Sequence, residues 1–208
     1  MRLLLHSCCA PCSGAIIETL AKDFRAEGRD PSEAMAIFWS NSNICDRQEY
    51  DKRKAEILRY AKLFGIEVIE DDYDHGEWLA EVARGREDAP ERGPRCLECF
   101  AYRLLRAARY AAANGFDTLT TSLASSRWKS LEQVDEAGAW ACAHVVDGLL
   151  AKSSAADHQA TSKGVQWWGR NWRKGGLQPR RSEIIREQNF YNQTFCGCEF
   201  SKGLISRN

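Results

Sequence analysis

Residues 2–24 read RLLLHSCCAPCSGAIIETLAKDF, which is a short apolar run, a cysteine-rich turn and an amphipathic stretch in succession. The run from Arg2 to His6 has the length and hydrophobicity of a buried strand. The apolar residues that follow, at positions 15, 16, 17, 20, 21 and 24, have helical spacing. A strand that leads directly into a helix is the first half of a βαβ unit.

The rest of the chain repeats this alternation. Apolar runs predict further strands, and amphipathic stretches predict further helices. We expect strands at 34–40, 66–70 and 117–123, and helices at 47–64, 75–84, 95–114, 131–144 and 181–190. This order predicts an α/β fold with a parallel, Rossmann-like sheet. Ligands of such sheets bind at the carboxyl ends of the strands, and the first cysteines follow such an end.

The length of 208 residues suits one domain over 1–208. Within it, a segment at about 153–180 shows no period and is expected to be a basic and aromatic loop. No stretch reaches the roughly 18 apolar residues of a membrane helix. The apolar run Leu3–Leu5 is too short for a signal peptide, so we expect a cytoplasmic protein. Basic and acidic residues both number 29, so net charge does not indicate an anionic partner.

The chain contains nine cysteines. In a reducing compartment, closely spaced thiols indicate metal or redox chemistry rather than a disulfide framework. Two cysteines without close partners are expected to be plain buried thiols, Cys45 and Cys142. The other seven form three clusters at element ends or in loops, namely Cys8, Cys9 and Cys12, the C-x2-C pair Cys96 and Cys99, and the C-x-C pair Cys196 and Cys198.

Thiolates are soft ligands that suit iron–sulfur clusters, zinc or copper(I). Seven thiols exceed the need of one iron–sulfur cluster, which indicates an open site or a second metal. We expect the neighbouring side chains of Cys8 and Cys9 to point in different directions and to bind two metals or two corners of one cluster. A structural zinc site is an alternative, although only one C-x2-C is present. A thioredoxin-like dithiol at Cys96 and Cys99 is another.

Five stretches carry a resemblance to a known family. They read LLHSCCAPCS (4–13), NSNICDRQEYDKR (41–53), RCLECFAYRL (95–104), FDTLTTSLASSRWKS (116–130) and FYNQTFCGCEFS (190–201). Together they resemble the QueH family of epoxyqueuosine reductases, in the same order and through nearly the whole chain. Three of the five contain cysteine clusters, which makes the resemblance far more specific than a single C-x2-C.

The resemblance implies a cobalamin-independent oxidoreductase of tRNA processing, in queuosine biosynthesis. It would reduce the epoxide of epoxyqueuosine at the tRNA wobble position to give queuosine, with electrons from an external donor. The family implies a 4Fe–4S cluster, an additional iron, and a fold like that of nucleotide-binding α hydrolases (HUP-like). Matched by motif, the metal ligands would be Cys8, Cys9, Cys96, Cys99, Cys196 and Cys198, with Cys12 as a candidate seventh. Which of them hold the cluster and which hold the iron stays open.

Two stretches depart from the family pattern. In the family, the second motif reads like N-P-N-I-x-P. Residues 41–46 of this chain read NSNICD and contain neither proline. The stretch at 170–174 resembles an Asp-Phe-Arg/Lys stretch in the family, but it reads RNWRK here. Asn171 replaces the acid, so a ligand or proton-donor role for that acid does not carry over to this chain.

Removal of an epoxide oxygen as water needs electrons, which side chains cannot supply, and protons, which they can. Three titratable residues in or beside the motifs are candidate proton donors, namely His6, Asp46 and Tyr191. The alternative for His6 is a packed histidine at a strand end. The alternative for Tyr191 is a core or base-stacking residue.

The substrate would be a base in an anticodon loop, and unpaired bases are bound by stacking and by cations that contact phosphate. Between residues 163 and 182 there are six basic residues, no acidic one and three tryptophans. This stretch supplies the candidates Trp168, Arg170, Trp172, Arg173 and Lys174. The alternative is a solvated loop that its tryptophans fix to the core. Lys129, beside Arg127, is a further phosphate candidate, and Arg103 would face the cluster one helical turn after Cys99.

Two other functions compete with this interpretation. A tRNA sulfur transferase or ATP-using enzyme of the same fold class needs a glycine-rich loop after the first strand, where this chain has only Gly14. A zinc- or thiol-based metal-binding protein would need neither the basic, aromatic stretch nor tRNA.

Overall fold

The computed structural model describes residues 1–150 and 164–202. Its centre is a sheet of five strands in the order β3-β2-β1-β4-β5, and every neighbouring pair is parallel. The strands are β1 (Leu3–His6), β2 (Met35–Trp39), β3 (Val68–Glu70), β4 (Thr118–Thr121) and β5 (Gln166–Trp167). The predicted α/β fold with a parallel sheet is confirmed.

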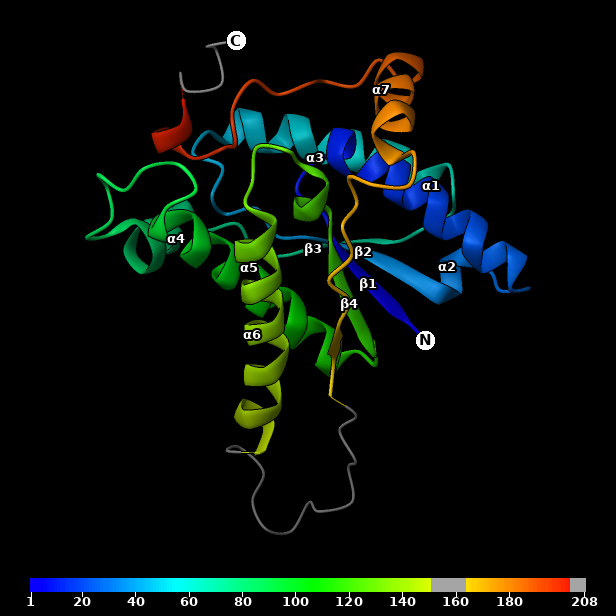
Figure 1. Cartoon of the computed structure of the whole chain (residues 1–208), viewed down its shortest axis with the longest axis horizontal. Coiled ribbons are helices and arrows are strands. Elements are labelled where there is room, and N and C mark those ends of the chain that lie inside the picture. The colour runs from blue at the N-terminus through cyan, green and yellow to red at the C-terminus, as the bar shows by residue number, and fades with distance from the viewer. Residues whose placement is uncertain (151–163, 203–208) are drawn as a thin grey trace.

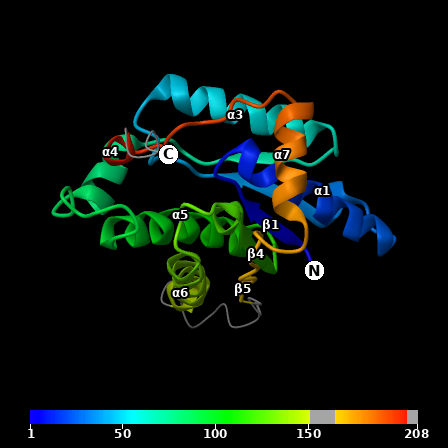
Figure 2. The same cartoon turned by 45° about the horizontal axis from the view of Figure 1, so that its top comes forward.

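Helices cover both faces of this sheet, as Figures 1 and 2 show. On one side lie α1 (Ala10–Ala26) and α3 (Arg47–Lys62), with α7 (Leu177–Glu187) packed against α1. On the other side lie α5 (Pro94–Ala113) and α6 (Leu131–Leu150), which pack against each other. The short elements are α2 (Pro31–Ala34), α4 (His75–Trp78), the π-helical turn η1 (Leu79–Ala83) and the 3-10 turns η2 (Ser122–Ser125) and η3 (Glu199–Ser201).

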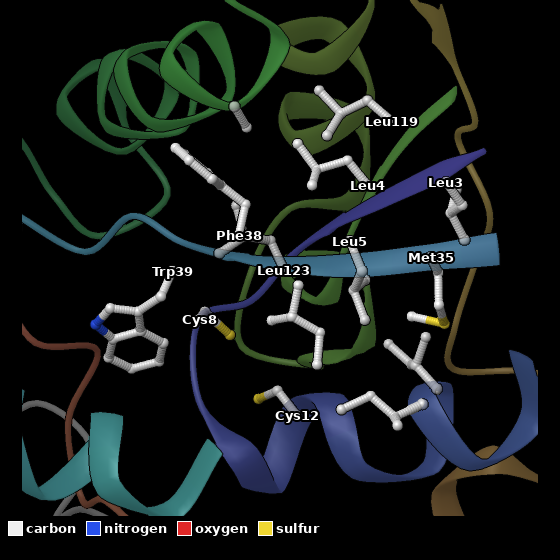
Figure 3. Close-up of a cluster of buried hydrophobic side chains, with 14 of the residues drawn as sticks. Leu3, Leu4, Leu5, Cys8, Cys12, Met35, Phe38, Trp39, Leu119 and Leu123 are labelled. Atoms are coloured by element: carbon white, nitrogen blue, oxygen red, sulfur yellow. The ribbon is translucent and has the colours of Figure 1, made fainter. Parts of the chain in front are cut away.

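The core begins at the central strand. Leu3, Leu4 and Leu5 are completely buried, because helices cover both faces of the sheet at β1. Figure 3 shows these leucines with Leu123 and, at the carboxyl end of the strand, the sulfurs of Cys8 and Cys12. The cysteine-rich turn is therefore continuous with the hydrophobic core and not a surface loop.

The first helix starts earlier than its apolar spacing predicts. Pro11 occupies the first turn of α1, where its missing N–H costs nothing, and Cys9 is the N-cap residue. Cys12 consequently lies in the first turn of the helix, with its thiol close to the helix N-terminus. The helix dipole favours negative charge at that position.

The thiols of the first motif lie at the switch point of the sheet. β1 pairs with β2 on one side and with β4 on the other, so the loops after β1 and β4 diverge next to each other. Cys8 follows β1 and Ser122 follows β4, and the Cys8 N–H donates to Ser122 Oγ at 3.0 Å. The predicted cysteine cluster at the carboxyl end of a strand is confirmed.

Among the described helices, none combines the length and the apolar character that crossing a membrane requires.

Candidate metal centre

The thiol trio consists of Cys8, Cys9 and Cys12. Their sulfurs all lie within 4.8 Å of one another, and the Sγ atoms of Cys8 and Cys9 are 3.9 Å apart. Two thiolates at 2.3 Å from one tetrahedral metal ion are about 3.8 Å apart. All three residues are buried and free of disulfide bonds. The trio therefore has the spacing expected of ligands to a single ion.

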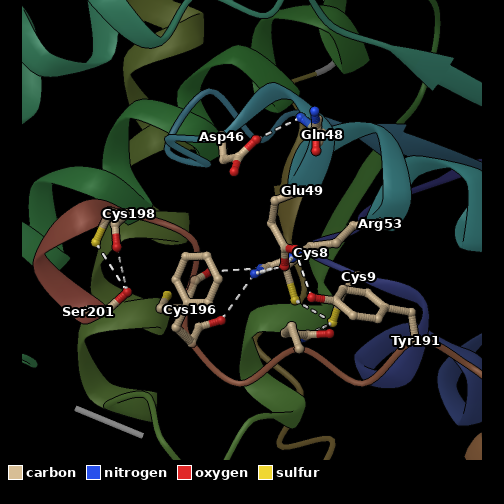
Figure 4. A network of polar contacts seen from close by, with 12 residues as sticks. Cys8, Cys9, Asp46, Gln48, Glu49, Arg53, Tyr191, Cys196, Cys198 and Ser201 are labelled. Carbon is tan, nitrogen blue, oxygen red and sulfur yellow. Dashed lines mark hydrogen bonds and ion pairs between the residues drawn. The ribbon is translucent and has the colours of Figure 1, made fainter. Parts of the chain in front are cut away.

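This spacing corrects the expectation that Cys8 and Cys9 diverge. Side chains alternate in direction only while the chain stays in a strand, and β1 ends at His6. The chain then turns into α1 at Cys9, and the turn brings both sulfurs to the same side. Figure 4 shows the two side chains together beside the C-terminal segment, from which Gln193 Nε2 donates to Cys9 Sγ at 2.8 Å.

Hydrogen bonds within the trio favour one thiolate. Contacts from Cys12 and Cys9 hold the pKa of Cys8 well below its usual value. Burial and the neighbouring sulfurs raise the pKa of Cys9. Ser122 Oγ lies 3.3 Å from Cys8 Sγ and adds a further donor. These contacts favour the thiolate form of Cys8, which would stabilise a cation bound by the trio.

The second thiol group consists of Cys96, Cys99, Cys196 and Cys198. The first two lie in the first two turns of α5 and the other two in the C-terminal segment, so the fold brings together residues that are far apart in sequence. Burial first, and then the charges of Cys196 and Cys96, raise the pKa of Cys99 to about 11. Burial and Cys196 likewise raise the pKa of Cys198 to about 12.

The two groups differ in spacing. Within the described residues, no three ligand atoms of the second group lie within 4.8 Å of one another, in contrast to the trio. Three of these thiols cannot hold one ion in this arrangement, but separate thiols can bind separate corners of a larger cluster. Cys99 and Cys198 also pack with the apolar residues Trp78, Val82 and Phe200, which keep water from this side.

Arg53 holds the C-terminal segment against α3. Its Nη1 donates to the Cys196 carbonyl at 3.0 Å and its Nη2 to the Phe195 carbonyl at 3.2 Å. The guanidinium also forms a buried ion pair with Glu49, with a closest N–O distance of 2.6 Å (Figure 4). This side chain therefore fixes the backbone that carries two of the seven thiols.

The backbone conformation between Cys196 and Cys198 requires a glycine, Gly197. Its φ is +134°, a value that side chains disfavour, and an added Cβ would lie 2.9 Å from Asn43 Nδ2. Its carbonyl accepts the N–H of Cys45 at 3.0 Å. The glycine thus allows the C-x-C turn to pack closely on the 41–46 loop.

A cavity of about 860 Å³ opens beside the thiols. Its lining includes sulfur-bearing residues from both groups, Cys8, Cys12 and Cys196. Among the described residues, five cationic side chains and one carboxylate, Glu91, also line it; the cations are Arg53, Arg103, Arg127, Lys129 and Arg181. The cavity can therefore admit an anionic ligand as far as the thiols.

Arg103 and Lys129 both line the cavity, and their charges act on the thiols. Arg103 is buried and donates to the Ser40 carbonyl at 3.0 Å. Its charge acts on Cys8 as well as on Cys99. Burial lowers the pKa of the Lys129 ammonium, but nearby thiolates raise it by more, so the net shift of the pKa is upward. These thiolates belong to Cys196, Cys8, Cys12 and Cys9.

The three candidate proton donors lie outside the cavity lining. His6 is completely buried, and its Nε2 faces the Ser40 carbonyl at 3.2 Å while its Nδ1 lies 2.7 Å from Thr121 Oγ1. Burial lowers the pKa of His6 to about 3, so the ring is neutral and packed, as the alternative interpretation states. Asp46 caps α3 by accepting from Gln48 N, as the dashed line in Figure 4 marks. Tyr191 donates to Glu49 Oε2 at 2.7 Å.

Of the basic, aromatic stretch, the described residues up to Lys174 do not line the cavity, whereas Arg181 near its end does. Trp172 is 1 % exposed and cannot stack on a base in this conformation. Trp168 packs edge-on against it, and the Arg170 guanidinium lies over both rings. Arg173 donates to backbone carbonyls, and Lys174 is exposed. Lys163 and residues 153–162 of this stretch fall outside the described residues.

The departures from the family pattern have local explanations. Asn171 Oδ1 accepts the N–H of Arg173 at 3.1 Å, which is a turn contact that a carboxylate could also make. Asn41, in the loop without prolines, donates to the Ser7 carbonyl at 2.9 Å and accepts from Arg103. In this chain, side-chain hydrogen bonds therefore fix the 41–46 loop, whereas in the family pattern two proline rings would restrict its backbone.

The two isolated cysteines differ in their environments. Cys142 on α6 is a plain buried thiol, as predicted. Cys45 is only partly buried, which corrects the expectation, because it lies at the end of the 41–46 loop just before α3.

Comparisons with known proteins agree with the arrangement. A family model described as epoxyqueuosine reductase QueH matches residues 3–203, which include all seven clustered cysteines. A protein of that name from Acinetobacter baylyi is 42% identical over 200 residues, covering 96% of this chain and 80% of the relative. One from Histophilus somni is 41% identical over 202 residues and 72% of its length. One from Thermotoga maritima is 27% identical over 202 residues and 89% of its length.

Proposed function

The chain belongs to the epoxyqueuosine reductase QueH family and is an oxidoreductase, and we propose that it reduces epoxyqueuosine in tRNA to queuosine without cobalamin. The single observation that carries the proposal is the cationic cavity, which ends at sulfurs from both thiol groups. An anionic RNA can approach such a cavity, and its reacting base can reach a redox centre there.

The reaction sets what the site must provide. Conversion of an epoxide to an alkene consumes two electrons and two protons and releases the oxygen as water. Side chains cannot donate the electrons, so a cofactor and an external electron donor are required. We propose a 4Fe–4S cluster and an additional iron, because seven free thiols in two groups exceed the need of either alone.

The difference in spacing suggests which thiols hold which metal. The close trio of Cys8, Cys9 and Cys12 suits one iron, and the wider second group suits the corners of a cluster. When bound, the cluster would supply electrons and the iron would polarise the epoxide C–O bond as a Lewis acid. The N-termini of α1 and α5 would both face bound anionic sulfur, which their dipoles stabilise.

Protein groups would bind the substrate and move the protons. Lys129 Nζ is charged and faces the thiols of both groups, so we place the proton for the departing oxygen on this atom. The guanidinium of Arg103, which also lines the cavity, would stabilise negative charge on that oxygen. Because the substrate would be a tRNA, the predicted cytoplasmic location forms part of the same proposal.

The experiment is an anaerobic purification followed by metal analysis and an assay. Iron, acid-labile sulfide and zinc are measured per chain, and the protein is then incubated with epoxyqueuosine-containing tRNA and a low-potential chemical reductant. We expect about four sulfides, more than four irons and the appearance of queuosine in the nucleoside digest. Stoichiometric zinc without sulfide, or an intact epoxide after incubation with the iron-loaded protein, would overturn the proposal.

A further inference from the structure

We propose that the rim loop, residues Ser126–Lys129, is a preformed RNA-binding element in which Trp128 stacks on an unpaired base next to the one that enters the cavity. This inference rests on the proposed function for the identity of the RNA. It concerns a residue with no part in metal binding, and it assigns a specific contact to one face of the cavity.

Trp128 lies where a substrate must pass. It lines the cavity together with Arg127 and Lys129, and 43 % of its surface is exposed. The Arg127 guanidinium carbon lies 5.0 Å from the centroid of its ring. An aromatic face and cations at the mouth of one groove are the two components by which proteins bind single-stranded nucleic acid.

The backbone of the rim loop is fixed from outside by two arginines. Arg173 Nη2 donates to the carbonyls of Ser126 and Lys129, at 2.6 and 2.8 Å. Arg92 donates to the two carbonyls between them, from Nε to Trp128 at 2.9 Å and from Nη2 to Arg127 at 3.1 Å. Four consecutive carbonyls are therefore satisfied by two side chains.

One of these arginines adopts a costly backbone conformation. Arg92 has a φ of +63°, in the left-handed region that non-glycine residues disfavour. The conformation is held by Gln133, whose Nε2 donates to the Arg92 carbonyl at 2.9 Å. Strain of this kind persists where the surroundings require it, and its result here is a rim loop that is ordered before any RNA binds.

The chemistry of the reaction explains why such a platform is needed. A base in an anticodon loop reaches the buried thiols only if it leaves the stack of its neighbours. The neighbouring base then loses one stacking partner, and an exposed indole at the cavity mouth can replace it. The cations Arg127 and Arg181 in the same lining are available to the flanking phosphates.

Trp140 provides a matched control. It is 40 % exposed, close to the value for Trp128, but it lies on α6, outside the cavity lining, against His144. Replacement of either tryptophan by alanine therefore removes a similarly exposed indole, so any general effect of that loss on the fold should be similar for W128A and W140A. Only W128A, at the cavity, should weaken RNA binding.

The test measures binding of a fluorescently labelled anticodon stem–loop RNA to the full chain at fixed salt. We expect W128A to raise the Kd by about 5- to 150-fold, which is the range for loss of one base–aromatic stack. W128F should retain most of the affinity, because any aromatic ring offers a stacking face, and W140A should bind like the wild type. Far-UV circular dichroism checks that each variant is folded.

A second readout reports stacking directly. 2-Aminopurine is placed on either side of the wobble nucleotide, where its fluorescence falls when it stacks on an indole. We expect quenching at one of the two positions with the wild type and with W140A, and none with W128A. If W128A binds the RNA with wild-type affinity, or quenches 2-aminopurine as the wild type does, this inference is overturned, although the protein still binds RNA. Failure of the wild type to bind the stem–loop would instead count against the proposed tRNA substrate.

Discussion

Arg53 Nη1 lies 3.0 Å from the backbone carbonyl oxygen of Cys196, although the two residues are 143 positions apart in the chain. The contact joins α3 to the C-terminal segment at the point where that segment carries two thiols. Because Arg53 is also paired with buried Glu49, its guanidinium has little freedom to move. Arg53 thereby acts as a positioning residue for Cys196.

Replacement of Arg53 should affect metal content and stability by separable routes. R53M leaves the Glu49 carboxylate buried without its partner, which costs about 3–5 kcal/mol of unfolding free energy. It also releases the carbonyls of Phe195 and Cys196, so we expect less iron and sulfide per chain. Urea unfolding and metal analysis measure the two effects. The double variant E49Q/R53M should regain stability but not metal, and full metal content in R53M would refute the positioning role.

Serine substitutions should separate the two proposed metals. C9S removes one sulfur of the close trio, so we expect it to lose iron while it keeps acid-labile sulfide. C99S removes a ligand of the wider group, so we expect loss of sulfide together with most of the iron. C142A, which changes a cysteine far from either group, serves as the control and should retain both. Equal loss of sulfide in C9S and C99S would contradict the division.

The sequence pattern identified the fold because β1 is a continuous apolar run and the helix after it has clear helical periodicity. It missed β5, which has only two residues, Gln166 and Trp167, and which is a strand only through its pairing with β4. It also missed the convergence of Cys8 and Cys9, because a two-residue alternation does not extend past the end of a strand. Tertiary context decided both points.

The sequence predicted those parts of the site in which several residues of one motif act together. It did not predict the residues that contribute singly. The cysteines were found by spacing alone, but Arg53 carries no local signal, since an arginine on a charged helix is usually solvated. Trp128 was overlooked because the tryptophans of 167–172 formed the denser pattern. In the structure Trp172 is core, and the exposed Trp128 faces the cavity.

The buried thiol of Cys142 should make stability depend on pH in the alkaline range. Burial raises the pKa of Cys142 to about 12, whereas the unfolded thiol ionises near its ordinary value of about 8.5. Between these values the folded chain binds the extra proton, so stability falls as pH rises, by about 1.4 kcal/mol per pH unit. Urea unfolding at pH 8 and pH 10 should therefore show a smaller loss for C142A than for the wild type. Equal losses would show that Cys142 does not titrate in this way.

Arg173 and Arg181 should differ in how they support RNA binding. Arg181 lines the cavity, so R181A should lower the affinity for the anticodon stem–loop and also reduce the slope of log K against log salt by about one. Arg173 donates to rim-loop carbonyls, so R173A should lower the affinity by loosening Trp128 while it leaves the salt slope unchanged. R109A, at an exposed arginine outside the cavity lining, controls for the loss of one positive charge. A reduced slope in R173A would show instead that Arg173 contacts phosphate, as the basic stretch in the sequence suggests.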